Sequence, residues 1–353
     1  MAENVRKIAK RAQVSTATVS RVIHQSDKVK PSTRERVEAA MQEMGLNPEE
    51  LIRSAKTDTR IIGVLVPDLT NMFFVEMIQG IEDVAKESGI SLFICHTKES
   101  DQNEIHYLRL LKEARVCGII ITPTSDDDDS VNNEYLNLLS SMNIPIVLVD
   151  RDVKHSRYDG VFIDNERGAF EATNLLLENG HTRIALISGP LNTTPGRDRM
   201  QGYRSAFARM QRPVDEELIF YGDFSIASGE TLTREILQRH PDVTAIFPVN
   251  NMMTLGCLAA LRKAGYSVPE DMAVVGFDRV DTLDMLGIPL SVVGRPTREM
   301  GQQAMKLLSK QLAGRRSTVA RRITLMPELC VNGSEKYFCS EQASKDGKGA
   351  SKE

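Results

Sequence analysis

The sequence contains no apolar stretch long enough to cross a membrane. A transmembrane helix needs about 20 consecutive, predominantly apolar residues, and no segment of the 353-residue chain approaches that length. The first residues, MAENVRKIAKRA, also lack the apolar stretch of a secretion signal. We therefore expect a soluble, cytoplasmic protein.

Cysteines are few and form no recognisable pattern. Their odd number, five, argues against a disulfide framework, and no two of them have the C-x-x-C spacing of a metal or redox site. An acidic run at residues 126–129 follows an apolar run, where a solvated loop is the simpler interpretation. We expect ordinary thiols, mostly buried, and no metal site. The cysteines are Cys95, Cys117, Cys257, Cys330 and Cys339.

Motifs of nucleotide-dependent enzymes are missing as well. The first apolar run leads into PDLTNMFF rather than a G-x-G-x-x-G loop, and no G-x-x-x-x-G-K-[ST] loop occurs. The six histidines are scattered, and His181, in the segment NGHTR, is expected to be structural. We therefore expect no enzyme, no catalytic residue and no cofactor.

The charge distribution separates a basic head from an acidic body. Residues 1–60 hold 12 lysines and arginines against 8 acids, a net charge of +4. The whole chain carries −4, so the remaining residues carry −8. We expect only the head to approach a polyanion such as DNA.

The basic head has the pattern of three short helices. Apolar and basic residues alternate at helical spacing in residues 4–12, and a three-residue break, 13–15, precedes a second helical pattern. Ser15 stands where a hydroxyl would cap that second helix. Residues 31–44 predict a third helix that ends at Gly45. Such an arrangement predicts a helix-turn-helix module, whose second helix enters the major groove.

The second of these patterns, VSTATVSRVIH (14–24), has one apolar and one polar face. Val19, Val22 and Ile23 recur at a spacing that can face a core. The other face carries hydroxyl groups and one arginine, with no acid for that arginine to pair with. We expect this face to contact DNA. Its members are Ser15, Thr16, Thr18, Ser20 and Arg21.

From residue 61 onward, short β-branched runs alternate with amphipathic helical segments. Continuous apolar strands that alternate with helices are typical of parallel sheets covered on both faces. The number of units favours two doubly wound lobes that split near residue 160, rather than one open sheet. The candidate strands are residues 61–66, 90–95, 118–122, 144–149, 183–188, 244–249 and 272–277.

Several segments together resemble the LacI/GalR family of bacterial transcription regulators over roughly residues 4–330. The head segments are VRKIAKRAQVSTATVSRVIH and VKPSTRERVEAAMQEMGLNP. The body segments are IIGVLVPDLTNMFF, NGHTRIALISGP, GRDRMQGY and VPEDMAVVGFD. The resemblance implies a three-helix headpiece and a two-lobed core like that of type I periplasmic binding proteins, with two doubly wound parallel sheets.

The resemblance also assigns roles within the second helix. Thr16, Ala17 and Arg21 occupy positions that face base edges in the family, and Ser15, Thr18 and Ser20 occupy positions that contact phosphates. An arginine can bind guanine O6 and N7 with both arms of its guanidinium, and such a contact is worth about 1–3 kcal/mol of discrimination. Gln13 stands in the turn where the family often has glycine or asparagine, so a left-handed backbone there is mildly strained.

The linker, residues 46–60, corresponds to the hinge helix of the family. In the family this helix folds on the operator and pushes a leucine from each subunit into the minor groove, which kinks the duplex. The matching position here is Ala55, whose side chain is too short to wedge in the same way. We expect Arg53 and Ala55 near the minor groove.

In the body, polar and aromatic residues follow the predicted strands, where ligands of open α/β sheets bind. Charged and amide groups satisfy sugar hydroxyls, and aromatic rings stack on the C–H faces of a sugar. The set resembles the pocket of the ribose-binding branch, except at Gly294, where that pocket has glutamine. Ribose is therefore the leading expectation, with another pentose, a nucleoside or a hexose as alternatives. The expected effector-binding residues are Asn71, Phe73, Phe74, Asp150, Arg151, Arg197, Phe224, Asn250 and Asp278.

Two other functions are weighed against this one. A sugar-binding transport protein would carry an export signal and no basic head, so residues 1–45 argue against that function. A carbon-catabolite regulator would take a phosphorylated carrier protein on its amino-terminal lobe, and VKPSTRERV is similar to that branch. The fuller set of sugar-contact residues favours a small-molecule effector. We expect a homodimeric repressor, without a zipper that would make a tetramer.

The expected organisation has four parts. They are a headpiece (1–45), a hinge and linker (46–60), an effector-binding and dimerisation core (61–333) and a disordered tail (334–353). Within the core, we expect an amino-terminal lobe of about 61–160 plus 291–320, and a carboxy-terminal lobe of about 161–290 plus 321–333.

Overall fold

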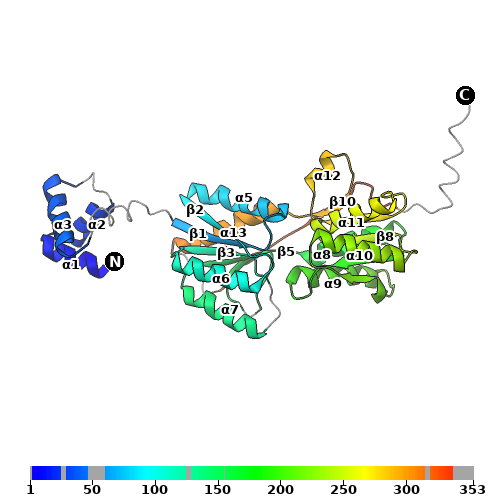
Figure 1. Ribbon diagram of the computed structural model, residues 1–353, viewed down its shortest axis with the longest axis horizontal. Helices are drawn as coiled ribbons and strands as arrows, with labels where there is room; N and C mark the ends of the chain where they lie inside the picture. Colours follow the sequence, from blue (N-terminus) through cyan, green and yellow to red (C-terminus); the bar gives the residue numbers. More distant parts are fainter. Residues whose placement is uncertain are drawn as a thin grey trace, which may run out of the picture. The chain divides into compact units, whose positions relative to one another are not determined.

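A computed structural model of the chain forms two compact units, residues 1–60 and 61–353. The structure describes residues 2–24, 29–46, 60–124, 129–154, 156–314 and 319–336. None of the helices in these ranges is long and apolar enough to span a bilayer. The first unit is all helical, and the second consists of two lobes, each built on one sheet (Figure 1).

The first unit contains the three expected helices, α1 (Ala2–Ala12), α2 (Thr16–His24) and α3 (Pro31–Glu43). Their shared core is fully buried and includes Ile8 of α1, Val19 and Val22 of α2, and Met41 of α3. Gly45 has a φ of 70°, a left-handed conformation that glycine adopts without a steric penalty, and it follows the end of α3 as predicted.

The amino-terminal lobe contains a six-stranded sheet in the order β11-β5-β4-β3-β1-β2. Strands β3, β4, β5 and β11 run parallel to one another and to β1. Helices α5 and α13 cover one face, and α6 and α7 cover the other (Figure 1). The strands are β1 (Arg60–Val66), β2 (Ile90–His96), β3 (Gly118–Ile121), β4 (Ile146–Val149), β5 (Asp159–Ile163) and β11 (Arg322–Leu325). The helices are α5 (Met72–Glu87), α6 (Asp101–Glu113), α7 (Asp129–Met142) and α13 (Thr297–Leu312).

The side-chain alternation of β1 explains why this sheet is covered on both faces. Ile62, Val64 and Val66 point into the core beneath α5 and α13, whereas Leu65 points into the core beneath α6 and α7. All four are fully buried. A strand that is apolar on both faces needs a helix layer on each, so the continuous apolar runs correctly predicted a parallel sheet.

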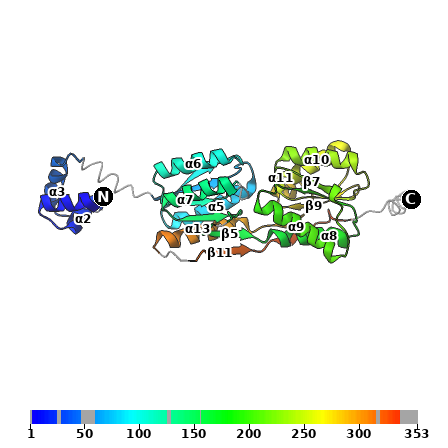
Figure 2. The same cartoon turned by 90° about the horizontal axis from the view of Figure 1, so that it is seen from below.

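The carboxy-terminal lobe repeats this architecture with the strand order β12-β10-β9-β8-β6-β7. All described pairs are parallel except β10 with β12, which is antiparallel. Helices α8 and α9 pack together on one face, and α10 and α11 on the other (Figure 2). The strands are β6 (Ile184–Ser188), β7 (Ile219–Tyr221), β8 (Ala245–Pro248), β9 (Ala273–Phe277), β10 (Ser291–Gly294) and β12 (Glu328–Cys330). The helices are α8 (Asn165–Glu178), α9 (Thr194–Arg209), α10 (Ile226–Arg239), α11 (Asn251–Ala264) and the short α12 (Asp281–Met285).

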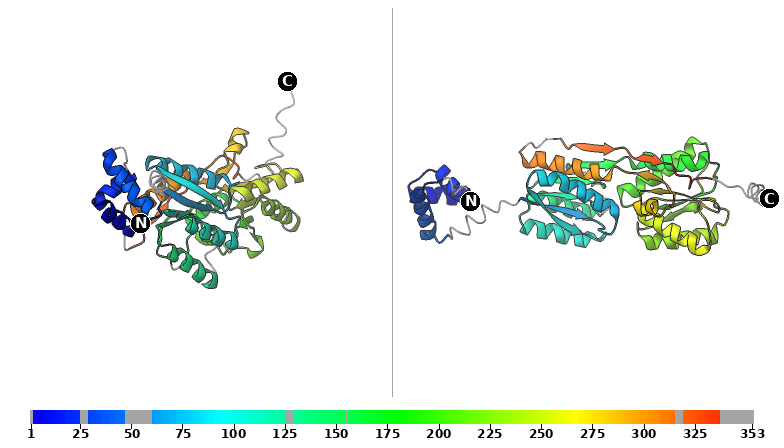
Figure 3. Two further views of the ribbon diagram at one scale, coloured as in Figure 1. Left: turned by 60° about the vertical axis from the view of Figure 1, so that its left-hand side comes forward. Right: turned by 90° about the horizontal axis from the view of Figure 1, so that it is seen from above.

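The chain passes between the lobes three times, after β5, after β10 and after β11. The last passage, from β11 to β12, runs along one side of both lobes (Figure 3). Because β5 and β11 pair in the amino-terminal sheet and β10 pairs in the other, each lobe boundary lies a few residues later than we expected. Pairing across the sheet decides these boundaries, and the local pattern does not reveal it.

We expected the disordered tail to begin at residue 334, but residues 334 and 335 belong to the folded lobe. Ser334 and Glu335 are buried, and the Ser334 hydroxyl donates a 2.6 Å hydrogen bond to the carbonyl of Val274 in β9. The backbone carbonyl of Glu335 lies 3.0 Å from Nε2 of His181, whose other ring nitrogen contacts Thr244. The structural role expected for His181 is confirmed, because it ties residues 333–336 to the lobe. Residues 337–353 lie outside the described ranges.

Candidate functional site

Helix α2 presents the polar face that its sequence predicted. Val19 and Val22 are fully buried against the other two helices. The side chain of Thr18 is half-buried. Arg21 forms no ion pair with any described residue. The exposed members of this face are Ser15, Thr16, Ala17, Ser20 and Arg21.

Ser15 caps α2. Its hydroxyl oxygen accepts a 3.1 Å hydrogen bond from the backbone N–H of Thr18, and the two hydroxyls of Ser15 and Thr18 lie 2.8 Å apart. One hydroxyl hydrogen serves this contact, so the pair keeps one for an outside acceptor. Gln13 has a φ of 52°, which confirms the strained turn. Arg53 and Ala55, the expected minor-groove residues, lie outside the described ranges.

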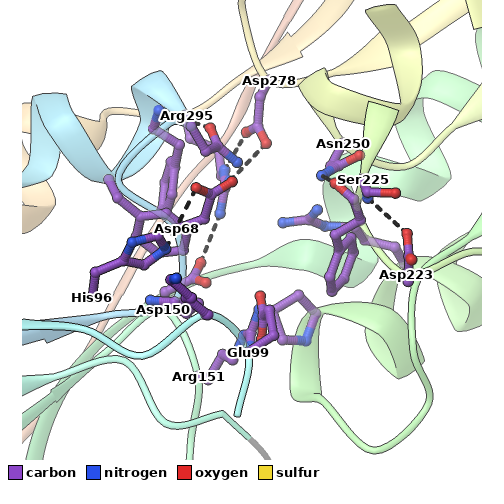
Figure 4. A pocket seen from close by; sticks show the side chains of 18 residues that line it. Asp68, His96, Glu99, Asp150, Arg151, Asp223, Ser225, Asn250, Asp278 and Arg295 are labelled. Carbon is purple, nitrogen blue, oxygen red and sulfur yellow. Dashed lines mark hydrogen bonds and ion pairs between the residues drawn. The ribbon is translucent and has the colours of Figure 1, made fainter. Parts of the chain in front are cut away.

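In the second unit, a cavity of about 270 Å³ lies between the two lobes. We call it the interlobe cavity, and Figure 4 shows its lining. Eight of the nine expected effector-binding residues line it: Asn71, Phe73, Phe74, Asp150, Arg151, Phe224, Asn250 and Asp278. Ten further residues complete the lining: Pro67, Asp68, His96, Lys98, Glu99, Pro195, Arg199, Asp223, Ser225 and Arg295.

The ninth expected residue, Arg197, does not line the interlobe cavity. Its guanidinium donates a 2.9 Å hydrogen bond to the carbonyl of Leu191. Arg199 takes the place in the cavity instead, because helical spacing puts it on the buried face of α9 with Pro195 and Tyr203. That periodicity was present in the sequence and could have distinguished the two arginines.

Arg295 joins two carboxylates of the cavity. Its Nη2 donates to Oδ2 of Asp278 at 2.7 Å, and its Nε donates to Oδ1 of the same carboxylate. Its Nη1 donates to Oδ1 of Asp150 at 2.7 Å (Figure 4). The guanidinium also lies 3.6 Å from the ring centroid of Phe73. Asp150 follows β4 and Asp278 follows β9, so Arg295 connects the two lobes.

The sequence marked the neighbouring residue, Gly294, as the departure from a ribose-type pocket. Gly294 does not line the interlobe cavity, whereas Arg295 does. Arg295 therefore adds a buried positive charge to the cavity, which the sequence analysis did not anticipate. Burial opposes this charge, but Asp278 and Asp150 outweigh that effect and raise the pKa of the guanidinium.

Arg199 is a second fully buried guanidinium in the cavity lining. Its Nε donates to Oδ1 of Asn165 at 2.9 Å, its Nη1 donates to the carbonyl of Val249 at 2.5 Å, and its Cζ lies 3.9 Å from the ring centroid of Phe277. It forms no ion pair with a described carboxylate. Burial, and then repulsion by Arg295, lower its pKa to about 9. The cavity thus contains a buried cation without an anionic partner of its own.

The cavity wall of the amino-terminal lobe contains a third buried arginine. Arg151 binds both oxygens of Glu99 at 2.7 Å and donates to the carbonyl of Thr124 at 3.0 Å. Its guanidinium lies 5.7 Å from the ring centroid of Phe224, which belongs to the opposite lobe. The two walls therefore approach each other closely, as they would around a small ligand.

The backbone around the cavity is strained. Nine non-glycine residues in the described ranges have a positive φ, and five of them line the cavity. Such conformations cost of order 1–3 kcal/mol each and persist where the surrounding fold imposes them, often at functional sites. They aim side chains inward from the loops after the strands. The five residues are Lys98, Glu99, Asp150, Phe224 and Asp278.

The matches to known protein families cover almost the whole described chain. Residues 4–49 match the model of "bacterial regulatory proteins, lacI family", and residues 59–332 match that of "periplasmic binding proteins and sugar binding domain of LacI family". The chain belongs to the lacI family of bacterial regulatory proteins. As a member of that family, it is a DNA-binding transcription regulator.

Curated relatives of this lacI-family chain include regulators from two bacteria. The transcriptional regulator DegA of Bacillus subtilis is 35% identical over 336 residues, which cover 95% of this chain and 98% of DegA. The transcriptional repressor CytR of Escherichia coli is 34% identical over 334 residues, which cover 94% of this chain and 96% of CytR.

Solved structures of the lacI family show the same fold. A complex of the transcriptional regulator CelR with cellobiose has a TM-score of 0.71 and 33% identity, and covers 94% of this chain and 99% of CelR. A regulator from Enterococcus faecium with bound ribose has a TM-score of 0.68 and 29% identity, and covers 79% of this chain and all of that one. These matches confirm a helix-turn-helix headpiece followed by two parallel α/β lobes.

Proposed function

We propose that this chain is a homodimeric transcriptional repressor whose operator binding is controlled by a sugar-like small molecule held in the interlobe cavity. The observation that carries the proposal is the buried guanidinium of Arg199, which lines the interlobe cavity without an ion-pair partner among the described carboxylates. A buried, incompletely paired cation is costly for a fold. A ligand that accepts hydrogen bonds from the Arg199 guanidinium accounts for the burial of this charge.

The exposed face of α2 supports the DNA-binding part of the proposal. The Ser15–Thr18 pair and Ser20 each offer one hydroxyl hydrogen to a phosphate, and Arg21 offers a fork of N–H donors to a guanine edge. The methyl group of Ala17 can contact a thymine methyl. Arg53 and Ala55 remain expected minor-groove contacts on the basis of the sequence. Because bacterial operators lie in the cytoplasm, we propose that location as well.

The shape and chemistry of the cavity support a monosaccharide-sized effector. Its volume of about 270 Å³ lies just below the range of drug-sized ligand pockets, which span about 300–1,000 Å³. The rings of Phe73, Phe74 and Phe224 can stack on the C–H faces of a sugar. A pentose frame such as that of ribose fits this size, and a hexose or a nucleoside is the alternative.

Exposed apolar side chains support the homodimer. Phe93 and Ile94 of the edge strand β2 are 52% and 42% exposed, and Met285 and Leu286 at the end of α12 are 84% and 68% exposed. Adjacent exposed pairs of large apolar residues, such as these two, favour a contact with another subunit. A two-fold symmetric pair would place two α2 helices on two operator half-sites about one helical turn apart.

The proposal is tested in two steps with the full-length protein. Selection from random DNA would first yield an operator, which we expect to be a pseudo-palindrome. Fluorescence anisotropy on that operator, with and without each member of a panel of sugars, nucleosides and sugar phosphates, would then identify the effector. In a thermal-shift assay, a true ligand at 100 times its Kd should add about 2.7 kcal/mol of apparent stability. A protein that selects no operator, or whose operator affinity no compound changes, would contradict the proposal.

A further inference from the structure

We propose that Arg295 makes the interlobe cavity select an anionic ligand, a sugar acid or a sugar phosphate, over the corresponding neutral sugar. The inference rests on the proposed function, since it names the chemical class of the effector. It follows from which hydrogen-bonding groups of the cavity are already occupied and which remain available.

The two buried carboxylates of the cavity are both held by Arg295, which occupies three of their acceptor sites. Both oxygens of Asp278 accept hydrogen bonds from Arg295, and Oδ1 of Asp150 accepts a third one. Neutral sugars need such carboxylates as acceptors for their hydroxyl hydrogens. Because Arg295 takes three of these acceptor sites and fixes both carboxylates, fewer acceptors remain for the hydroxyl hydrogens of a neutral sugar, and each unpaired buried donor weakens binding.

The groups that remain available are mainly donors. Nη2 of Arg199 has no hydrogen-bond partner among the described residues, and neither has Nδ2 of Asn71, whose Oδ1 already accepts two hydrogen bonds. Arg295 uses three of its five N–H groups on the two carboxylates. A donor-rich, buried surface of this kind requires a ligand rich in acceptors, and a carboxylate or phosphate accepts several charge-assisted bonds at once.

The other carboxylates of the lining are paired or partly open to solvent, and the exposed Lys98 adds a further donor. Glu99 is paired with Arg151. Asp68 accepts hydrogen bonds from Thr70, and Asp223 accepts one from Ser225. Asp68 is half-buried and Asp223 is exposed, so water screens their charges more than those of the buried groups.

The test compares ribose, ribonate and ribose 5-phosphate by isothermal titration calorimetry on three full-length proteins. These are the wild type, Arg295→Gln and the control Arg298→Gln. Arg298 forms a matching two-armed pair with Asp83, at 2.8 and 3.1 Å, but is exposed and does not line the cavity. Ribonate and ribose 5-phosphate distinguish a carboxylate from a phosphate as the anionic group.

We expect the wild type to bind one of the anionic compounds at least about tenfold more tightly than ribose, which corresponds to 1.4 kcal/mol. Arg295→Gln should reverse this preference, because it frees Asp150 and Asp278 to accept hydroxyl hydrogens. If the role of Arg295 is purely structural, Arg295→Gln should bind all three ligands more weakly and to the same extent, with no gain in the affinity for ribose. Arg298→Gln should leave the order unchanged.

Two results would overturn the inference. One is a wild type that binds ribose as tightly as both anionic compounds, which needs no variant to be informative. The other is an unchanged preference in a folded Arg295→Gln protein. If that variant does not fold, Arg295→Lys replaces it: lysine cannot bind both carboxylates in the same forked geometry, so the preference should shrink. A protein that binds selected operator DNA but neither ribose nor its anionic derivatives would also overturn the inference. In that case the cavity does not bind sugars of this class, whereas the DNA-binding part of the proposed function stands.

Discussion

The side-chain amide of Asn251 donates a 2.8 Å hydrogen bond to Oδ1 of Asn71, and this buried bond joins the two lobes. The same oxygen accepts from the backbone N–H of Phe73 and so caps α5. Asn251 is the first residue of α11. A single oxygen therefore couples the start of a helix in one lobe to the start of a helix in the other.

Replacing Asn251 with alanine should loosen the closure of the lobes. The variant removes one buried hydrogen bond, which is worth about 1 kcal/mol. We expect a larger radius of gyration by small-angle X-ray scattering and an effector affinity reduced about fivefold. Gln201→Ala is a suitable control, because it removes an exposed 3.4 Å bond on α9. Identical scattering curves for wild type and Asn251→Ala would contradict this role.

Replacing Arg21 with alanine should abolish selective DNA binding and spare ligand binding. The exposed guanidinium is the strongest base-reading group on α2, and one two-armed arginine–guanine contact contributes about 1–3 kcal/mol of discrimination. Anisotropy on selected and on scrambled operators measures the loss. The control Arg36→Ala removes the same charge from an exposed position on α3, so it should weaken both DNAs equally. Retained discrimination in Arg21→Ala would show that other residues read the bases.

Two substitutions of Ser15 separate its capping role from its expected phosphate contact. Ser15→Ala removes the acceptor for the Thr18 amide and should lower headpiece stability by about 1 kcal/mol. Ser15→Asp keeps a good N-cap but adds a negative charge, so stability should be retained while DNA affinity falls. Thermal unfolding and DNA anisotropy measure the two effects separately. An Asp variant that binds DNA as well as the wild type would place Ser15 away from the phosphates.

Gly189 makes room for the ring of Phe224. A Cβ added at Gly189 would lie 2.2 Å from that ring, so Gly189→Ala must displace Phe224 from the cavity wall. We expect an effector affinity reduced about tenfold with the operator affinity of the unliganded protein unchanged. A second glycine-to-alanine substitution, Gly314→Ala, cannot serve as the control, because Gly314 has a φ of 80° and alanine would be strained there. The control is Ala208→Gly on the exposed face of α9, which changes one methyl group in the same lobe outside the cavity. It should leave the effector affinity unchanged.

Glu104 should make the stability of the amino-terminal lobe depend on pH. The carboxylate is fully buried, accepts hydrogen bonds from the amide and hydroxyl of Thr124 at 2.8 and 2.5 Å, and burial raises its pKa from 4.5 to about 7. The folded state therefore binds the proton more tightly than the unfolded state does. This contribution is fully present below about pH 4.5 and is lost as the pH rises to about 7, a change of about 3 kcal/mol.

The comparison with Glu104→Gln isolates this effect, because glutamine mimics the neutral acid at every pH. We expect the free energy of unfolding of the wild type, measured with urea, to fall relative to that of Glu104→Gln between pH 5 and pH 8. Glu113→Gln, an exposed position at the end of the same helix, should show no such difference. A wild type and a Glu104→Gln variant that change in parallel across this range would rule out Glu104 as the titrating group.

The sequence by itself determined the features that depend on neighbouring residues. The helical spacing of Val19 and Val22 and the hydroxyl of Ser15 correctly predicted α2 and its cap, because helix periodicity and capping act over three or four residues. All seven apolar runs became strands of parallel sheets. The cavity residues that directly follow strands, such as Asp150 and Asp278, were predictable because the carboxyl ends of parallel strands meet at one edge of a sheet.

Only the tertiary structure decided which of these groups satisfy one another. The short strands β7 and β11 have too few apolar residues to be recognised alone, and the buried Ser334 lies in a polar segment that reads as disordered. Arg295 meets Asp278 and Asp150, which lie 17 and 145 positions away along the chain. A charge acquires its partner through the packing of two lobes, which local sequence patterns do not encode. That pairing sets which hydrogen-bonding groups remain for a ligand.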